Sequence, residues 1–272
     1  MDAIATLSSH DNSVVAESNK KRPPAISVNR LAMRYKTSDG DLVALENINF
    51  EIGKGEFISV VGPSGCGKST LLTIIAGLVR ATSGIVTVHG NRVTEPISDL
   101  GFVFQKDLLL EWRSVLGNIL LQADVRGLPR EEAKRKALLL LKQVGLEGFE
   151  NRNPWELSGG MRQRVAICRA LLPSAGILLM DEPFGALDAL TRDRINLDLQ
   201  NIWSTERPTA LLITHSISEA VFLSDRVLVM SSRPGRIIDD VRIDLPRPRN
   251  ASTRDTAEFV AFQHRLRMSI GQ

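Results

Sequence analysis

The order of apolar and polar positions along the chain predicts a mixed α/β protein. Apolar residues alternate with polar ones in the segments 26–33 and 42–52, which is typical of half-buried antiparallel strands, and 84–90 has a similar character. Short continuous apolar runs predict further strands, which are more deeply buried. These runs occupy 57–61, 100–104, 177–180 and 210–213, and the segments 227–230 and 236–238 form a predicted closing hairpin.

Helical patterns separate these strands and also end the chain. They cover 71–76, about 115–145, the residues that follow Ser158, and 257–270. Residues 1–24 are polar and have little to bury, so we expect a disordered leader there. The predicted division is a leader (1–24), one large domain (25–245) with a helical subdomain (about 106–172), and a C-terminal linker and helix (246–272).

A glycine-rich loop connects the predicted strand 57–61 to the predicted helix 71–76. Glycines let the backbone turn sharply and present successive N–H groups to an anion, and the helix adds the positive end of its dipole. In such a loop Lys68 reaches the β- and γ-phosphates, the Ser69 hydroxyl binds Mg²⁺, and Thr70 lies near the α-phosphate. The predicted phosphate-binding loop consists of Gly62, Pro63, Ser64, Gly65, Cys66, Gly67, Lys68, Ser69 and Thr70.

Two carboxylates and a histidine follow predicted strands. Asp181 and Glu182 come directly after 177–180, and the carboxyl ends of parallel strands are where open α/β sheets bind ligands. Asp181 is suited to hold Mg²⁺, and Glu182 is suited to polarise an attacking water. His215 follows 210–213 and is therefore expected near the γ-phosphate. Tyr35 fits two interpretations equally well, an aromatic at a strand end and a platform for an adenine ring.

A second helix start suited to anions follows Leu157. Ser158 stands at the expected N-cap, and Gly159 and Gly160 leave the backbone N–H groups of the first turn uncovered. This helix start brings no lysine and no metal ligand, so by itself it offers only half of a nucleotide site. A two-fold dimer would complete the site by placing Ser158 of one copy against the phosphates held by Lys68 of the other.

The 272 residues carry 34 basic and 31 acidic side chains, and this near balance does not indicate nucleic acid as a partner. The only cysteines, Cys66 and Cys168, suit a reducing compartment better than a disulfide framework. No apolar run approaches the ~20 residues that cross a bilayer, and the N-terminus has no secretory h-region. We therefore expect a cytoplasmic protein that needs another chain to cross a membrane.

In their order along the chain, six motifs resemble those of the ATP-binding cassette (ABC) ATPases. The resemblance covers about 27–242, and the signature is its most specific part. More narrowly, 109–115, 185–192 and 230–237 resemble the nitrate, aliphatic sulfonate and taurine importer branch, although Glu111 stands where that branch often has proline. The six motifs are Walker A (62–70), the Q-loop (Gln105), the signature (157–163), Walker B (178–182), the D-loop (186–188) and the H-loop (His215).

The resemblance implies a P-loop NTPase core with a mainly parallel sheet, an antiparallel β subdomain and an α-helical signature subdomain. It implies ATP hydrolysis with Mg²⁺, in which Glu182 is the general base, His215 steadies the γ-phosphate and Lys68 binds the phosphates. Gln105 would sense Mg²⁺ and the water, and Asp188 would communicate across a head-to-tail dimer. Ser158, Gly159, Gly160 and Gln163 of one subunit would contact ATP held by the other.

By the same resemblance the chain would be the ATPase subunit of an importer for a small anionic solute, peripheral on the inner face of the cell membrane. A membrane permease would contact 105–112, where Leu108, Leu109, Leu110 and Trp112 form an unusually apolar segment. A periplasmic or extracellular solute-binding protein would take part indirectly. The alternative is a soluble ABC-type ATPase without a role in transport, although 70–157 lacks the sustained heptads of the DNA-repair members.

Overall fold

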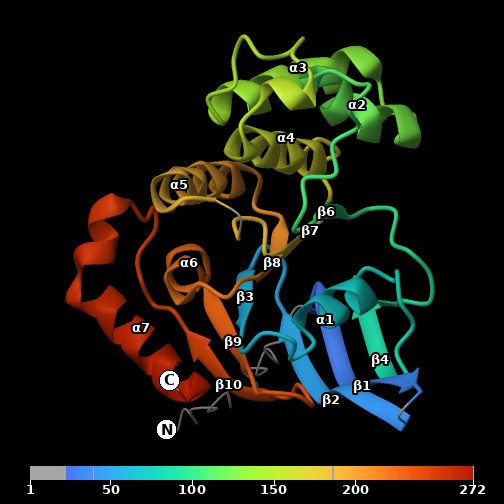
Figure 1. The fold of residues 1–272 in the computed structure, drawn as a ribbon, viewed down its shortest axis with the longest axis vertical. Coiled ribbons are helices and arrows are strands. Elements are labelled where there is room, and N and C mark those ends of the chain that lie inside the picture. Colours follow the sequence, from blue (N-terminus) through green and yellow to red (C-terminus); the bar gives the residue numbers. More distant parts are fainter. Residues whose placement is uncertain (1–22, 39, 186, 272) are drawn as a thin grey trace, which may run out of the picture.

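A computed structural model describes residues 23–38, 40–185 and 187–271, so the predicted leader lies outside the described residues except for Pro23 and Pro24 (Figure 1). The strands are β1 (Ile26–Thr37), β2 (Gly40–Ile52), β3 (Phe57–Val61), β4 (Ser83–Val88), β5 (Asn91–Arg92), β6 (Gly101–Val103), β7 (Ile177–Asp181), β8 (Thr209–Ile213), β9 (Arg226–Met230) and β10 (Ile237–Arg242). The helices are α1 (Lys68–Ile75), α2 (Val115–Arg126), α3 (Arg130–Gln143), α4 (Gly159–Leu171), α5 (Ala189–Glu206), α6 (Ile217–Leu223) and α7 (Ala257–Ile270), with short 3-10 helices η1 (Pro154–Glu156) and η2 (Ala251–Asp255).

The strands form two sheets. The main sheet has the order β10-β9-β3-β8-β7-β6, and its strands are parallel except for β10, which forms the predicted hairpin with β9. The smaller sheet has the order β2-β1-β4-β5 and is antiparallel, with Ile26 of β1 opposite Ile52 on one side and Val88 on the other. The strands predicted from the apolar pattern are thereby confirmed.

Both faces of the main sheet are buried, because alternate residues of each parallel strand enter different cores. In β3, Phe57 and Val61 belong to a core that also contains residues of α2 to α7. Ile58 and Val60 of the same strand belong to a second core, together with α1 and the antiparallel sheet. Figure 1 shows this arrangement, with α1 on one side of β3 and α6 and α7 on the other.

The helical segment predicted for about 115–145 consists of two helices. Gly127 ends α2 in the left-handed conformation (φ 64°), and Pro129 stands just before α3. Glycine adopts that conformation without the steric cost of a Cβ atom, and proline cannot continue a helix from within it. The two helices pack with α4 in a separate helical layer above the main sheet (Figure 1).

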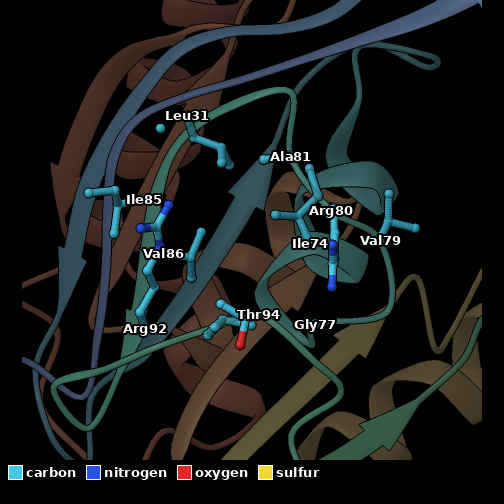
Figure 2. A pocket seen from close by; sticks show the side chains of 12 residues that line it. Leu31, Ile74, Gly77, Val79, Arg80, Ala81, Ile85, Val86, Arg92 and Thr94 are labelled. Atoms are coloured by element: carbon cyan, nitrogen blue, oxygen red, sulfur yellow. The ribbon is translucent and has the colours of Figure 1, made fainter.

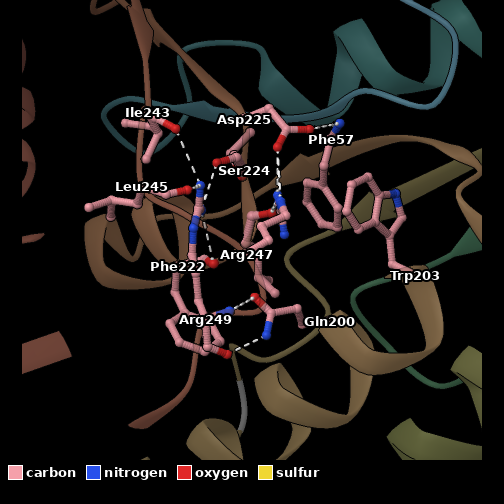
Figure 3. Close-up of polar contacts among 12 residues, drawn as sticks. Phe57, Gln200, Trp203, Phe222, Ser224, Asp225, Ile243, Leu245, Arg247 and Arg249 are labelled. Atoms are coloured by element: carbon pink, nitrogen blue, oxygen red, sulfur yellow. Dashed lines mark hydrogen bonds and ion pairs between the residues drawn. The ribbon is translucent and has the colours of Figure 1, made fainter. Parts of the chain in front are cut away.

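The segment after β10 binds tightly to the rest of the domain through Arg249 (Figure 3). The side chain of Arg249 is 1% exposed. Its guanidinium donates five hydrogen bonds to backbone carbonyls at the end of α6 and after β10. The acceptors are the carbonyls of Val221 (2.7 Å), Phe222 (3.1 Å), Ser224 (2.8 Å), Ile243 (3.3 Å) and Leu245 (3.1 Å).

Candidate active site

Four neighbouring parallel strands of the main sheet place the candidate residues at one edge. The order β3-β8-β7-β6 brings their carboxyl ends side by side, and a ligand binds at such an edge because the loops that follow the strands converge there. Segments that are far apart in the sequence therefore meet. These are the glycine loop after β3, His215 after β8, Asp181 and Glu182 at the end of β7, and Gln105 after β6.

The conformation of the glycine loop requires glycine at its junction with α1. Gly67 has φ +102° and precedes the first residue of the helix. A Cβ atom at this position would lie 2.7 Å from Leu45 Cδ2 and 3.0 Å from the carbonyl oxygen of Ala44. The antiparallel sheet therefore packs directly against the loop and leaves no space for a side chain there.

Lys68 is buried, and its ammonium group lies within the loop. Its Nζ donates to the carbonyl oxygens of Gly62 (2.9 Å) and Pro63 (3.0 Å). The positive charge is thus held among the backbone groups that would surround a polyphosphate. Cys66 belongs to the same loop, and its side chain is buried in the core on the α1 side of the sheet.

A pocket of about 290 Å³ opens over the loop, and nine of the predicted site residues line it. Leu42, Ala44 and Arg233 also line it, and the sequence analysis assigned them no role. Arg233 donates from Nε (3.1 Å) and Nη2 (2.8 Å) to the carbonyl oxygen of Gly65. Its segment, 230–237, resembled the importer branch, but that resemblance did not predict a place for Arg233 at the glycine loop. The predicted residues in the lining are Tyr35, Ser64, Gly65, Gly67, Lys68, Ser69, Thr70, Gln105 and Glu182.

Tyr35 lies at the mouth of the loop. Its hydroxyl is 3.5 Å from the hydroxyl oxygen of Thr70, and the ring forms part of the pocket wall. The residue is 37% exposed, so part of it is available to a ligand. This placement fits the predicted platform for an adenine ring, and that role stays a prediction.

Ser69 and Asp181 meet across the site. The Ser69 hydroxyl donates to Asp181 Oδ1 at 2.9 Å. Burial raises the pKa of Asp181, and the bond from Ser69 opposes this change. Among the described residues no group of three or more His, Cys, Asp or Glu could hold a metal ion. One carboxylate and one hydroxyl nevertheless fit Mg²⁺, because this ion usually takes few protein ligands beside phosphate oxygens and water.

Glu182 and His215 form a pair at the next position along the edge. The distance between Glu182 Oε2 and His215 Nδ1 is 3.3 Å. Glu182 has a positive φ of 42°, a conformation that non-glycine residues rarely adopt, and its N–H donates to the carbonyl of Ile213 at 2.9 Å. Such strain is often found at functional sites, where the surrounding structure holds the residue in place.

The signature residues lie apart from this pocket. Ser158 is the N-cap of α4, as predicted, and its hydroxyl accepts a bond from the N–H of Met161 at 3.3 Å. Ser158 and Gly159 are exposed, whereas Gly160 and Gln163 are buried. None of these four residues lines the pocket over the glycine loop. Within one chain the two anion-ready helix starts therefore stay separate.

A second hollow, of about 280 Å³, lies between α1 and the antiparallel sheet (Figure 2). Most of its lining is aliphatic, including Leu31, Ile74 and Val86, and it contains two arginines but no carboxylate. It offers neither the glycine loop nor the acidic pair of the first pocket. The predicted chemistry belongs to the first pocket.

Comparison with known proteins identifies the family. The family model described as ABC transporter matches residues 45–185. An uncharacterised ABC transporter ATP-binding protein of Methanocaldococcus jannaschii is 47% identical over 241 residues, which are 89% of each chain. The chain belongs to the ABC transporter family. The resemblance drawn from the six motifs is thereby confirmed, and the chain is an ABC-type ATPase.

Another relative is the aliphatic sulfonates import ATP-binding protein SsuB of Bacillus cereus, 45% identical over 86% of this chain and 92% of its own. Among solved structures, the chain is similar to a dimeric bacterial ABC transporter cassette (TM-score 0.72, 33% identity, 81% of this chain and 100% of that one). It is also similar to a dimeric post-hydrolysis ATP-binding cassette bound to ADP and Pi (TM-score 0.71, 33% identity, 81% and 100%). The predicted P-loop NTPase fold of the ABC ATPases is confirmed.

No helix in the described part of this ABC protein is both long enough and apolar enough to span a membrane.

Proposed function

We propose that this chain is the ATP-hydrolysing subunit of an importer for a small anionic solute of the aliphatic sulfonate, taurine or nitrate type. The observation that carries the proposal is the meeting of Lys68, Asp181, Glu182 and His215 at one sheet edge beside the pocket of about 290 Å³ over the glycine loop. The similarity to the Bacillus sulfonate import subunit supports the importer role and favours a sulfonate.

The glycine loop binds the phosphates of ATP in this proposal. Lys68 exchanges its bonds to loop carbonyls for bonds to phosphate oxygens, and Tyr35 stacks on the adenine. Ser69 and Asp181 would hold Mg²⁺, with Gln105 beside them, and the ion would supply positive charge next to the phosphates. Burial raises the pKa of Asp181, and a bound divalent cation would offset this by stabilising the carboxylate.

Glu182 orients and deprotonates the attacking water. Its carboxylate projects into the pocket from the end of β7, and its contact with His215 fixes both side chains. When both ring nitrogens of His215 carry a proton, Nδ1 can donate to Glu182 and Nε2 can donate to the γ-phosphate. The rate enhancement in this account comes mainly from position and charge.

Each site is completed by a second subunit. Ser158 and Gly159 are exposed, and the backbone N–H groups at the start of α4 suit an anion. They do not reach the pocket of their own chain, so we assign them to the γ-phosphate of ATP bound by the facing subunit. ATP would then close the dimer and hydrolysis would loosen it, because ADP lacks the shared phosphate.

A permease helix docks beside the Q-loop in this proposal. Trp112 (78% exposed) and Leu108 (52%) project from the segment that follows Gln105, whereas Leu109 is buried. Beside this segment lies a groove of about 610 Å³ lined by Phe102, Phe104, Leu78 and Val125 among others. An amphipathic helix buries its apolar face in such a groove, and importer ATPases work with membrane permeases.

The docking segment, residues 105–112, is attached by hydrogen bonds to α4, the helix that begins in the signature motif. Arg162 Nε donates to Asp107 Oδ2 at 3.0 Å, and Arg169 donates to the carbonyl oxygens of Asp107 (2.7 Å) and Leu108 (2.8 Å). Arg162 and Arg169 both belong to α4, whose first residues face the partner's ATP in this account. Closure of the dimer would therefore move the docking segment and the permease helix together.

The substitution Glu182→Gln tests the proposal. Loss of a general base lowers the rate of hydrolysis by about 10²–10⁴-fold, whereas ATP binding should persist. We expect the variant to form ATP-dependent dimers, measured by light scattering after size exclusion, and Glu131→Gln at an exposed position serves as the control. Hydrolysis at the wild-type rate, or a strictly monomeric variant with ATP, Mg²⁺ and permease present, would contradict it.

The solute class has its own test. Deletion of the gene should abolish growth on an alkanesulfonate or taurine as the sole sulfur source, or on nitrate as the sole nitrogen source. A plasmid copy of the wild type should restore growth, and the Glu182→Gln copy should not. Normal growth of the deletion strain on all three compounds would reject the proposed solutes and leave the ATPase chemistry intact.

A further inference from the structure

A buried carboxylate, Glu219 of α6, lies between two loops of the candidate active site. Its side chain has little solvent contact, because the residue is only 4% exposed. One oxygen, Oε2, accepts a hydrogen bond from the hydroxyl of Thr214, and the other, Oε1, lies 3.3 Å from Arg192 Nε. Burial raises the pKa of Glu219, whereas Thr214 and Arg192 both favour the charged form. A buried carboxylate needs such partners.

The bond to Thr214 fixes the backbone next to His215. The Thr214 hydroxyl donates to Glu219, and its oxygen accepts from the N–H of Ser216 at 2.9 Å. The Ser216 hydroxyl in turn accepts from the N–H of Glu219 at 3.3 Å. His215 lies between Thr214 and Ser216, and both of these residues are hydrogen-bonded to Glu219. The position of the His215 imidazole therefore depends on where Glu219 is held.

Arg192 connects Glu219 to the D-loop. It lies in the first turn of α5, whose N-cap is Asp188, and its N–H donates to the carbonyl oxygen of Asp188 at 2.9 Å. Its Nη2 donates to the carbonyl oxygen of Leu187 at 3.0 Å. The contact between Arg192 Nε and Glu219 is an ion pair that does not meet hydrogen-bond geometry. It holds the two groups together mainly by charge, in surroundings that screen charge weakly.

A continuous set of contacts thus runs from the carbonyl of Leu187 through Arg192, Glu219 and Thr214 to the backbone of His215. The set of contacts extends to Glu182, because His215 Nδ1 lies 3.3 Å from Glu182 Oε2. Neither Arg192 nor Glu219 lines the pocket over the glycine loop, so neither is placed to touch the nucleotide. Arg192 instead contacts the D-loop at Leu187, and Glu219 contacts Thr214, the residue before His215.

We propose that Arg192 and Glu219 are positioning residues that make the placement of His215 depend on the position of the D-loop, Leu187 and Asp188. The inference rests on the proposed function, in which His215 acts at the γ-phosphate and the D-loop faces the second subunit. A partner that moves this loop would then change the rate of hydrolysis in the pocket without touching the nucleotide.

The first experiment measures kcat and KM for ATP, the affinity for a fluorescent ATP analogue, and the melting temperature of the full chain. We expect Arg192→Met and Glu219→Gln to lower kcat by roughly 10- to 100-fold, as small misplacements of reacting groups do, with ATP affinity changed less than about twofold. Arg194→Met changes an exposed arginine two residues along the same helix and should leave kcat unchanged. Wild-type kcat in both Arg192→Met and Glu219→Gln would overturn the inference.

The second experiment separates positioning from simple support of the fold. Asp188→Asn keeps the capping oxygen of α5 but removes the charge, and we expect it to lower kcat in the wild-type background. In the Arg192→Met background the same change should have little further effect, because the link to His215 is already broken. An equal fold-change in both backgrounds would show that the residues act independently and would reject the proposal.

Two further variants, Arg192→Lys and His215→Ala, extend the test. If Arg192→Met does not fold, Arg192→Lys retains the charge opposite Glu219 but cannot reach Leu187 in the same way. It should keep the wild-type melting temperature and lose part of kcat, and full activity in it would count against the inference. His215→Ala tests the proposed role of His215 at the γ-phosphate, and an unchanged kcat in this variant would refute that role. A lower kcat in His215→Ala together with a wild-type kcat in Arg192→Met would refute only the positioning role of Arg192.

Discussion

Arg249 offers a direct test of how the C-terminal segment stabilises the domain. The substitution Arg249→Met keeps much of the apolar volume but removes the donors to five backbone carbonyls. Three of these, on Val221, Phe222 and Ser224, lie at the carboxyl end of α6, where helical carbonyls lack partners and a positive charge is favourable (Figure 3). The substitution therefore removes the cap of the helix that follows His215.

The magnitude follows from these contacts. A buried acceptor that loses its donor costs about 1–3 kcal/mol, and water entering the vacated space keeps each carbonyl near the lower value, so the five together cost about 5 kcal/mol. The variant recovers part of the cost of burying a charge, about 2 kcal/mol. Burial already lowers the pKa of Arg249 to about 10, which reflects that cost. The net loss of stability is therefore about 3 kcal/mol, or a decrease in Tm of roughly 6–12 °C for a chain of this size.

Thermal unfolding followed by circular dichroism measures this change. The matched control is Arg242→Met, because the Arg242 side chain is 80% exposed and its ion pair with Asp244 should contribute less than about 1 kcal/mol. Arg249→Lys should fall between the two, since one ammonium cannot reach both groups of carbonyls. If Arg249→Met melts within about 2 °C of the wild type, the buried hydrogen bonds do not stabilise the domain as argued here.

Three further predictions concern the loop, the docking segment and a buried thiol. Gly67→Ala should weaken ATP binding at least tenfold by titration, because its Cβ would meet Leu45 Cδ2 at 2.7 Å, while Gly90→Ala, whose Cβ would meet open space, should not. Trp112→Ala should abolish transport in reconstituted vesicles and spare ATP binding; full transport would disprove the docking role. Burial raises the pKa of Cys168 to about 12 from 9.0, so iodoacetamide should label Cys168 only after unfolding. Because the unfolded thiol loses its proton first, this group should lower the stability as pH rises above about 9.

Local patterns in the sequence were sufficient for the strands and for the strand-end chemistry. The apolar runs before Gly62, Asp181 and Thr214 predicted buried strands, and β3, β7 and β8 confirm them. The glycine loop was recognisable because its conformation depends on consecutive residues. Parallel strands end at one edge, so the meeting of these segments followed from the fold class once the strands were known. The catalytic roles assigned to Glu182 and His215 stay predictions.

Contacts between distant segments needed the tertiary structure. The approach of Arg233 to Gly65 joins positions 168 residues apart, and nothing local to either position indicates it. The same holds for Arg192 and Glu219, because α5 and α6 were not predicted and only their packing brings the two charges together. The segment around Arg249 had the polar and proline-rich composition of a linker, yet the fold buries its guanidinium against the end of α6 and the segment after β10.

The sequence by itself determined the family, the order of the motifs along the chain and the residue types that bind polyphosphate. Each of these depends on short-range patterns along the chain. The tertiary structure decided which of the apolar residues after Gln105 face solvent, with Leu109 buried and Trp112 exposed. It also decided that Ser158 lies away from the pocket of its own chain. Exposure and proximity depend on how the layers pack, and packing involves residues that no local pattern relates.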